Sequence, residues 1–90
     1  MGLEEFREKL DIIDQDLVDK LSERMAVIPL VAEYKKTNGV SRYHPEREEE
    51  IIQTKRSLAE RHGISPDMVE AIYREIFKES HRIEKEIMGE

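Results

Sequence analysis

The chain has 90 residues, of which 40% are charged, and a formal net charge of -6. This acidic balance argues against broad nucleic-acid binding, which needs a basic face. The absence of cysteine excludes disulfides and thiol chemistry and fits a reducing cytoplasm. No apolar run approaches the ~20 residues that span a bilayer, and the three histidines lack metal-ligand spacing. We therefore expect one cytoplasmic domain, residues 1–90, with no metal, nucleic-acid or membrane partner.

Residues 3–38 are predicted to form one long helix, ended by Asn38-Gly39. Pro29 lies inside it, and because the apolar pattern keeps its phase there, we expect a kink without a break. Such a helix would run for ~50 Å, more than a chain of this size can bury alone. We therefore expect it to reach into a second copy of the chain. Its core-facing stripe at helical period is Leu10, Asp14, Leu17, Leu21, Arg24, Ile28, Val31 and Lys35.

Two shorter helices follow. Pro45 suits the first position of a helix that ends at His62-Gly63. Ser65-Pro66-Asp67 is a strong start signal for a helix over residues 66–88, with serine as the N-cap. Strand signals are missing. The chain should be all-α, with one long, one short and one medium helix in a bundle.

Several charges fall on these apolar stripes, where a charge is costly without a partner. Arg24 and Lys35 are eleven residues apart, close to three helical turns, so both point into one apolar groove about 16 Å apart. Glu84 lies on the stripe of the third helix. Arg7 is roughly 100° around the long helix from Arg24 and points elsewhere, towards a symmetry-related site.

This combination of charges favours a small dianionic carboxylate ligand, because arginine grips a carboxylate with a planar fork and lysine adds a point charge. The sequence offers neither a Ser–His–Asp set nor a cysteine nucleophile. A reaction that needs only shape and charge stabilisation, without a cofactor or a covalent step, fits such a site.

Three segments resemble the all-helical chorismate mutases: the run from Arg7 to Arg24, the segment Ala32-Glu33-Tyr34-Lys35, and Pro45-Glu46-Arg47-Glu48. Each is weak alone, but their order and spacing are specific, and the similarity extends over residues 3–86. The resemblance implies an intertwined homodimer with two equivalent sites. It also implies a Claisen rearrangement of chorismate to prephenate, a step towards phenylalanine and tyrosine.

The resemblance further implies roles for the residues that handle the reacting atoms. Arg24 would bind one substrate carboxylate, and Arg7 from the other subunit would bind the second. Lys35 would donate to the ether oxygen that becomes negative in the transition state, and Glu84 would be the second donor to it. Because Glu84 can donate only when protonated, we expect higher activity at acidic pH.

The same resemblance assigns supporting roles. Glu48 would hold the ring hydroxyl, Arg47 would support the site electrostatically, and Ser80 would lie close to a carboxylate. His44 departs from the pattern, because some members of the family have aspartate there. Histidine cannot replace that negative charge, so we interpret His44 as a bystander.

Alternatives remain at this stage. Isochorismate-pyruvate lyase shares the fold and much of the site, and a non-catalytic dimeric helical module would need no site at all. Asp14 is interpreted as structural, Arg47 and Glu48 also suit a helix start, and Ser80 also fits a core hydroxyl bonded to the Ile76 carbonyl. No extra segment is seen to house a feedback site.

Overall fold

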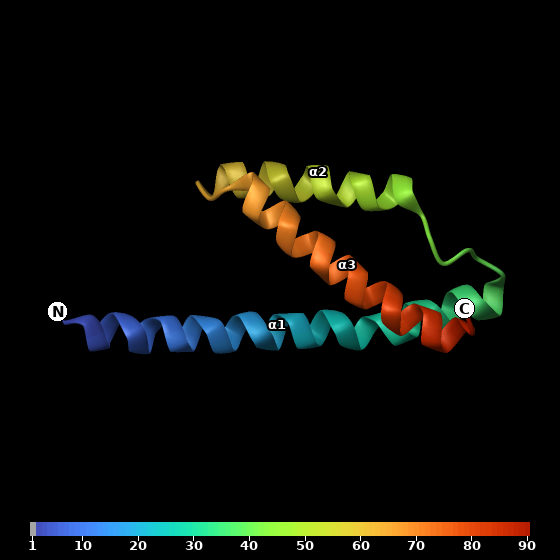
Figure 1. Cartoon of the computed structure of the whole chain (residues 1–90), viewed down its shortest axis with the longest axis horizontal. Helices are drawn as coiled ribbons and strands as arrows, with labels where there is room; N and C mark the ends of the chain where they lie inside the picture. Colours follow the sequence, from blue (N-terminus) through green and yellow to red (C-terminus); the bar gives the residue numbers. More distant parts are fainter. Residues whose placement is uncertain (1) are drawn as a thin grey trace.

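A computed structural model describes residues 2–90 as three helices: α1 (Leu3–Asn38), α2 (Pro45–Arg61) and α3 (Pro66–Met88) (Figure 1). No strand occurs within this range. The prediction of an all-α chain with one long, one short and one medium helix is confirmed.

Local signals account for the helix ends. α1 continues through Pro29 without a break and ends at Gly39, whose backbone at φ 64° is left-handed and whose N–H donates to the Lys35 carbonyl. α2 starts with Pro45 after His44, whose side chain makes no capping bond. α3 starts after Ser65, whose hydroxyl oxygen accepts the Met68 N–H at 3.1 Å.

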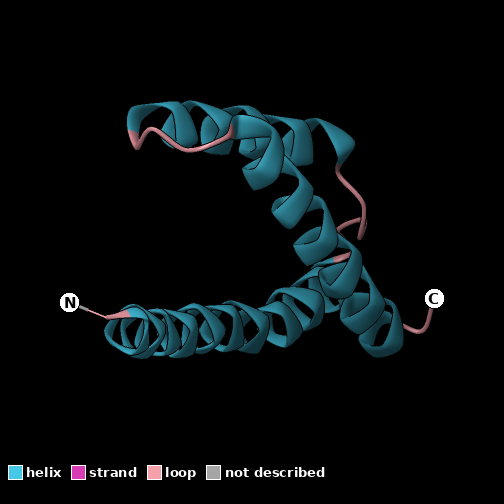
Figure 2. Cartoon of the chain, turned by 60° about the vertical axis from the view of Figure 1, so that its left-hand side comes forward, coloured by secondary structure: helices cyan, strands magenta, loops and turns pink. Residues whose placement is uncertain are grey.

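α3 is the central element, because it packs against both α1 and α2, which do not pack against each other. Its C-terminal half crosses the C-terminal half of α1, while its N-terminal end lies beside α2 (Figures 1 and 2). The N-terminal half of α1 projects away from the other helices in both views. The three helices and the 39–44 connection therefore come together near the C-terminal half of α1.

The hydrophobic core of the single chain is small. Its buried apolar side chains come from all three helices: Ala32, Ile52, Ala59, Ile76 and Phe77. The chain extends over 56 × 24 × 15 Å, and its radius of gyration is 16.4 Å. A compact domain of this length would have about 12 Å. The chain is thus too extended to cover its own apolar surface.

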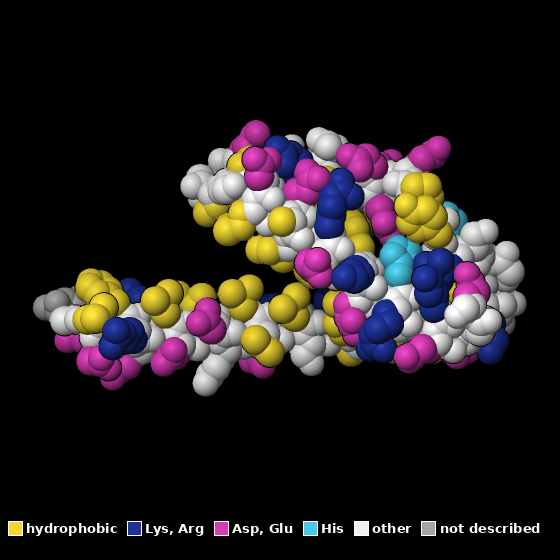
Figure 3. Space-filling model, in the orientation of Figure 1, with side chains coloured by type: hydrophobic (Ala, Val, Ile, Leu, Met, Phe, Trp, Pro, Cys, Tyr) yellow, Lys and Arg dark blue, Asp and Glu magenta, His cyan; other side chains and the backbone are white. Residues whose placement is uncertain are grey.

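The uncovered apolar surface is concentrated on α1. Every residue of α1 before Arg24 is exposed, including the predicted stripe positions Leu10 (56%) and Leu17 (57%). Figure 3 shows hydrophobic side chains along the side of α1 that is turned towards α2 and α3, with more on the opposing end of those helices. Within one chain, the predicted stripe is partly covered only from Arg24 onward, at Arg24, Ile28 and Lys35, while Val31 stays exposed.

Candidate active site

A pocket of about 350 Å³ lies where the C-terminal halves of α1 and α3 meet the 39–44 connection and the start of α2. Its wall includes aliphatic and aromatic side chains as well as charged ones. Six of the seven predicted site residues line it: Arg24, Lys35, Arg47, Glu48, Ser80 and Glu84. The pocket therefore gathers residues from three helices that are far apart in the sequence.

Lys35 and Glu84 form a buried ion pair on one side of the pocket. The Lys35 Nζ donates to Glu84 Oε1 at 2.9 Å and to the Arg42 carbonyl at 2.8 Å. Glu84 is only 5% exposed, and a carboxylate at that depth is costly unless it is paired. An ammonium group has three N–H donors, so Lys35 keeps one for a ligand.

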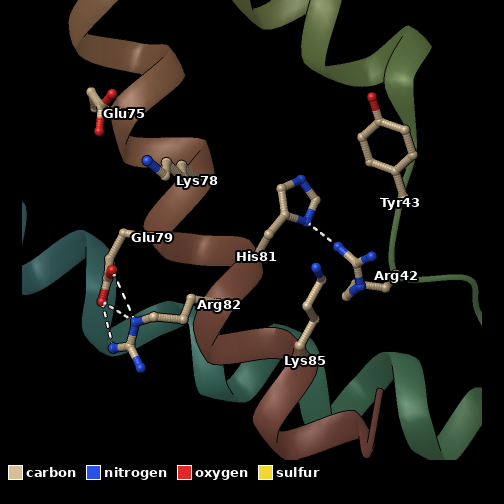
Figure 4. A pocket seen from close by; sticks show the side chains of 8 residues that line it. All are labelled: Arg42, Tyr43, Glu75, Lys78, Glu79, His81, Arg82 and Lys85. Carbon is tan, nitrogen blue, oxygen red and sulfur yellow. Dashed lines mark hydrogen bonds and ion pairs between the residues drawn. The ribbon is translucent and has the colours of Figure 1, made fainter.

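A second network, which the sequence did not predict, lies beside the first. The Arg42 Nη1 donates to His81 Nδ1, and His81 Nε2 bonds to Glu48 Oε2 (Figure 4 shows the Arg42–His81 bond). Because arginine can only donate, Nδ1 must accept, and the imidazole hydrogen lies on Nε2. The one available signal was that His81 precedes Glu84 by three residues, which places both on one side of α3.

Arg24 faces the pocket from α1 over aromatic side chains. Its guanidinium carbon lies 5.9 Å from the ring centroids of both Tyr73 and Phe77. Such cation–π contacts hold the charge in place without neutralising it. Arg24 forms no ion pair with any carboxylate in the described range 2–90 and remains available to an anionic ligand.

The remaining predicted residues are placed differently. Arg47 is largely exposed at the rim and lies 3.5 Å from Glu50. The Ser80 hydroxyl donates to the Ile76 carbonyl at 2.9 Å, as one of the two interpretations of this residue expected. His44 also lines the pocket. Arg7 does not: it lies on the projecting half of α1, paired with Glu4 at 2.9 Å.

The charge balance of the pocket is opposite to that of the whole chain. The cations that line it are Arg24, Lys35, Arg42 and Arg47, and the carboxylates are Glu48 and Glu84. With neutral histidines, the lining side chains carry an excess of two positive charges. A pocket walled by low-dielectric side chains concentrates such a field. The ligand class that it suits is a small dianion.

Two further properties concern the described range 2–90. No group of three or more His, Cys, Asp or Glu side chains in it is arranged to hold a metal ion. None of its helices combines the length and the apolar character needed to cross a membrane.

Fold and pocket together define a small all-helical chain whose pocket is lined by more cations than carboxylates. Comparison with known families identifies the family to which such a chain belongs. The chain belongs to the chorismate mutase type II family, whose profile matches residues 6–85. No solved structure gives a significant match.

Several curated proteins are similar to this chain over most of its length. The T-protein of Enterobacter agglomerans is 34% identical over 89% of this chain and 21% of its own length, and that of Haemophilus influenzae is 32% identical over 94% and 22%. The chorismate mutase of Methanocaldococcus jannaschii is 28% identical over 98% of this chain and 89% of its own. The chain thus spans about a fifth of the two T-proteins.

Proposed function

We propose that this chain is a chorismate mutase, which rearranges chorismate to prephenate in phenylalanine and tyrosine biosynthesis in the cytoplasm. The observation that carries the proposal is the pocket with two excess positive charges. In it, Lys35 and Glu84 lie on one wall, and Arg24 has no ion partner among residues 2–90. Chorismate is a dianion and so matches the charge of the pocket. The reaction is inferred from the family to which the chain belongs.

Substrate binding rests on arginine. Arg24 holds one carboxylate, since its guanidinium is oriented by two aromatic rings and has no carboxylate partner among residues 2–90. Arg7 of a second subunit holds the other carboxylate. A fork-like pair of hydrogen bonds fixes the substrate in the folded conformation that brings its reacting carbons together.

The chemical step needs stabilisation of negative charge on the ether oxygen as its bond to carbon breaks. The unused N–H of Lys35 donates to this oxygen, and protonated Glu84 is the second donor. Because both groups are already held in a partly dry pocket, little reorganisation is needed in the transition state. No covalent intermediate or cofactor is required.

The other pocket residues orient the substrate. Glu48 accepts a hydrogen bond from the ring hydroxyl, and Arg47 adds to the positive field at the rim. Ser80 lies close to a substrate carboxylate and forms part of the pocket wall. It does not donate to that carboxylate, because its hydroxyl hydrogen is directed to the Ile76 carbonyl.

The functional unit that we propose is an intertwined homodimer. Its support is the row of exposed apolar side chains on the first half of α1: Leu3, Phe6, Leu10, Ile13, Leu17 and Leu21. A second copy of the same chain provides a matching apolar surface, since Met68 and Ile72 at the start of α3 are also about half exposed. Insertion of one α1 against the other chain's α3 buries both surfaces and carries Arg7 across.

The test is chorismate consumption by the purified chain, with Arg24→Ala and the control Arg82→Ala. Arg82 is an exposed arginine that does not line the pocket of Arg24, and it is paired with Glu79 and Glu86. We expect turnover by the wild type and the control, and at least a 100-fold loss in Arg24→Ala, about the value of two hydrogen bonds to a charged group. Pyruvate release from isochorismate without chorismate turnover would identify a lyase instead. Inactivity on both would favour a non-catalytic module.

A further inference from the structure

We infer that His81, held in place by Arg42, is a positioning residue that aims Glu48 at the hydroxyl-bearing end of the substrate. The inference deepens the proposed function and rests on it. Neither residue was expected to contribute from the sequence, and both line the pocket.

His81 is held on several sides. Its Nδ1 accepts from Arg42, its Nε2 donates to Glu48, and the ring of Tyr43 packs edge-on at a centroid distance of 5.4 Å. Arg42 is itself anchored to Glu90 at 3.2 Å. The 39–44 connection and the C-terminal end of α3 therefore fix the imidazole before any ligand arrives.

This arrangement decides what Glu48 offers to a ligand. His81 binds Oε2, whereas Oε1 of Glu48 has no hydrogen-bond partner among residues 2–90 and is open to a group in the pocket. An ionised carboxylate can only accept hydrogen bonds, so Glu48 acts as an acceptor. The ligand atom opposite Oε1 must then be a hydrogen-bond donor, such as a ring hydroxyl, because an acceptor there would leave Oε1 without a donor.

The first experiment does not depend on turnover. Nitrogen chemical shifts of the histidine rings, measured by NMR on the full chain at about pH 7.5, report which His81 nitrogen carries the hydrogen, with His81→Gln used to assign the signal. We expect hydrogen on Nε2 alone. Hydrogen on Nδ1, or rapid exchange between both forms, would overturn the inference whether or not the chain is a mutase.

The second experiment uses a matched pair of variants and a chorismate assay. The amide of Gln reaches the position of Nε2 and can still donate to Glu48, whereas that of Asn reaches only the position of Nδ1. His81→Asn should raise KM by about 10-fold with kcat nearly unchanged. The reason is that a misdirected Glu48 loses its hydrogen bond to the substrate equally in the ground state and the transition state. His81→Gln should stay within about 3-fold of the wild type.

Coupling to Glu48 separates positioning from general support of the fold. In a Glu48→Gln background, His81→Asn should change KM by less than about 2-fold, because the partner through which it acts is gone. An equal loss in both backgrounds, or equal loss in the Asn and Gln variants, would contradict the inference. Absence of turnover in the wild type would instead refute the proposed function and leave the NMR result to decide on His81.

Discussion

At the scale of single residues, the ion pair of Lys35 and Glu84 sets the chemistry of the pocket. The two side chains are 49 positions apart and meet at 2.9 Å with little exposure to solvent. In this pairing Glu84 accepts a hydrogen bond, but the proposed reaction needs it as a donor. A proton on Glu84 is therefore the expected requirement for full activity.

The first prediction concerns Glu84→Gln. A Gln amide donates at every pH and still offers an oxygen to Lys35, so the variant should have a flat rate profile between about pH 5 and pH 8 and exceed the wild type at about pH 7.5 by roughly 10-fold. The wild-type rate should rise towards acidic pH. The measurement is kcat against pH, with Glu75→Gln on the exposed part of α3 as control. A flat wild-type profile would remove Glu84 as a donor.

At the scale of elements, several ion pairs join α2 to α3, and Glu70 takes part in one of them. Glu70 of α3 lies 2.9 Å from Arg56 of α2 and 2.9 Å from Arg74 of its own helix. The hydrogen bond from Arg74 is the main cause that lowers the pKa of Glu70 from its ordinary value, and the bond from Arg56 adds to it. The pKa of Arg56 is raised first by its hydrogen bond to Asp67 and then by its hydrogen bond to Glu70. The pKa of Arg74 is raised mainly by its hydrogen bond to Glu70.

The second prediction follows from the sign of this shift. A carboxyl whose pKa is lowered by folding stabilises the fold above its ordinary pKa, and this stabilisation is lost as pH falls through the lowered value. Glu70→Gln should therefore melt below the wild type at about pH 7, and the difference should be smaller near pH 3. Thermal melts of both proteins at the two pH values test this. A difference of the same size at the acidic pH would show that Glu70 acts through packing.

At the scale of the whole molecule, the projecting half of α1 dominates. A helix that is exposed from Leu3 to Glu23 gains little from tertiary packing in one chain, although tertiary packing supplies most of the stability of helices in proteins. The same residues carry the apolar stripe and Arg7. Stability and completion of the pocket are thus expected to depend on the same association.

The third prediction is that folding and dimerisation are one event. The melting temperature should rise as the protein concentration increases from about 1 to 100 µM, because mass action favours the folded dimer. Leu17→Glu, which places a charge on the exposed stripe, should lower the melting temperature, while Glu23→Gln on another side of α1 should not. A concentration-independent melt together with a monomer mass would contradict the intertwined dimer.

The fourth prediction tests the shared site directly. Arg7→Ala and Arg24→Ala should each be inactive as pure proteins. Unfolded together and refolded as an equal mixture, they should recover about a quarter of wild-type activity, since half of the dimers are mixed and each mixed dimer has one intact site. If Arg7 acted within its own chain, no site would be repaired and the mixture would stay inactive.

The sequence alone determined the helices, because helix ends depend on neighbours a few positions away. Ser65 before Pro66, and the glycines at 39 and 63, specify their boundaries locally, and all three helices lie where they were predicted. It also indicated six of the pocket residues. Arg24, Lys35 and Glu84 are charges at core-facing helical positions, where a charge is costly without a partner, and the family resemblance pointed to Arg47, Glu48 and Ser80.

Only the tertiary structure decided how these residues are partnered. The Glu48–His81 contact joins positions 33 apart and the Arg42–His81 contact positions 39 apart, and no local spacing encodes such pairs. Arg42 lies in an irregular connection whose path is set by how α2 docks on α3, so neither its guanidinium nor its carbonyl could be placed from periodicity. The helices follow from local chemistry, whereas the network that orients Glu48 exists only because packing brings three distant segments together.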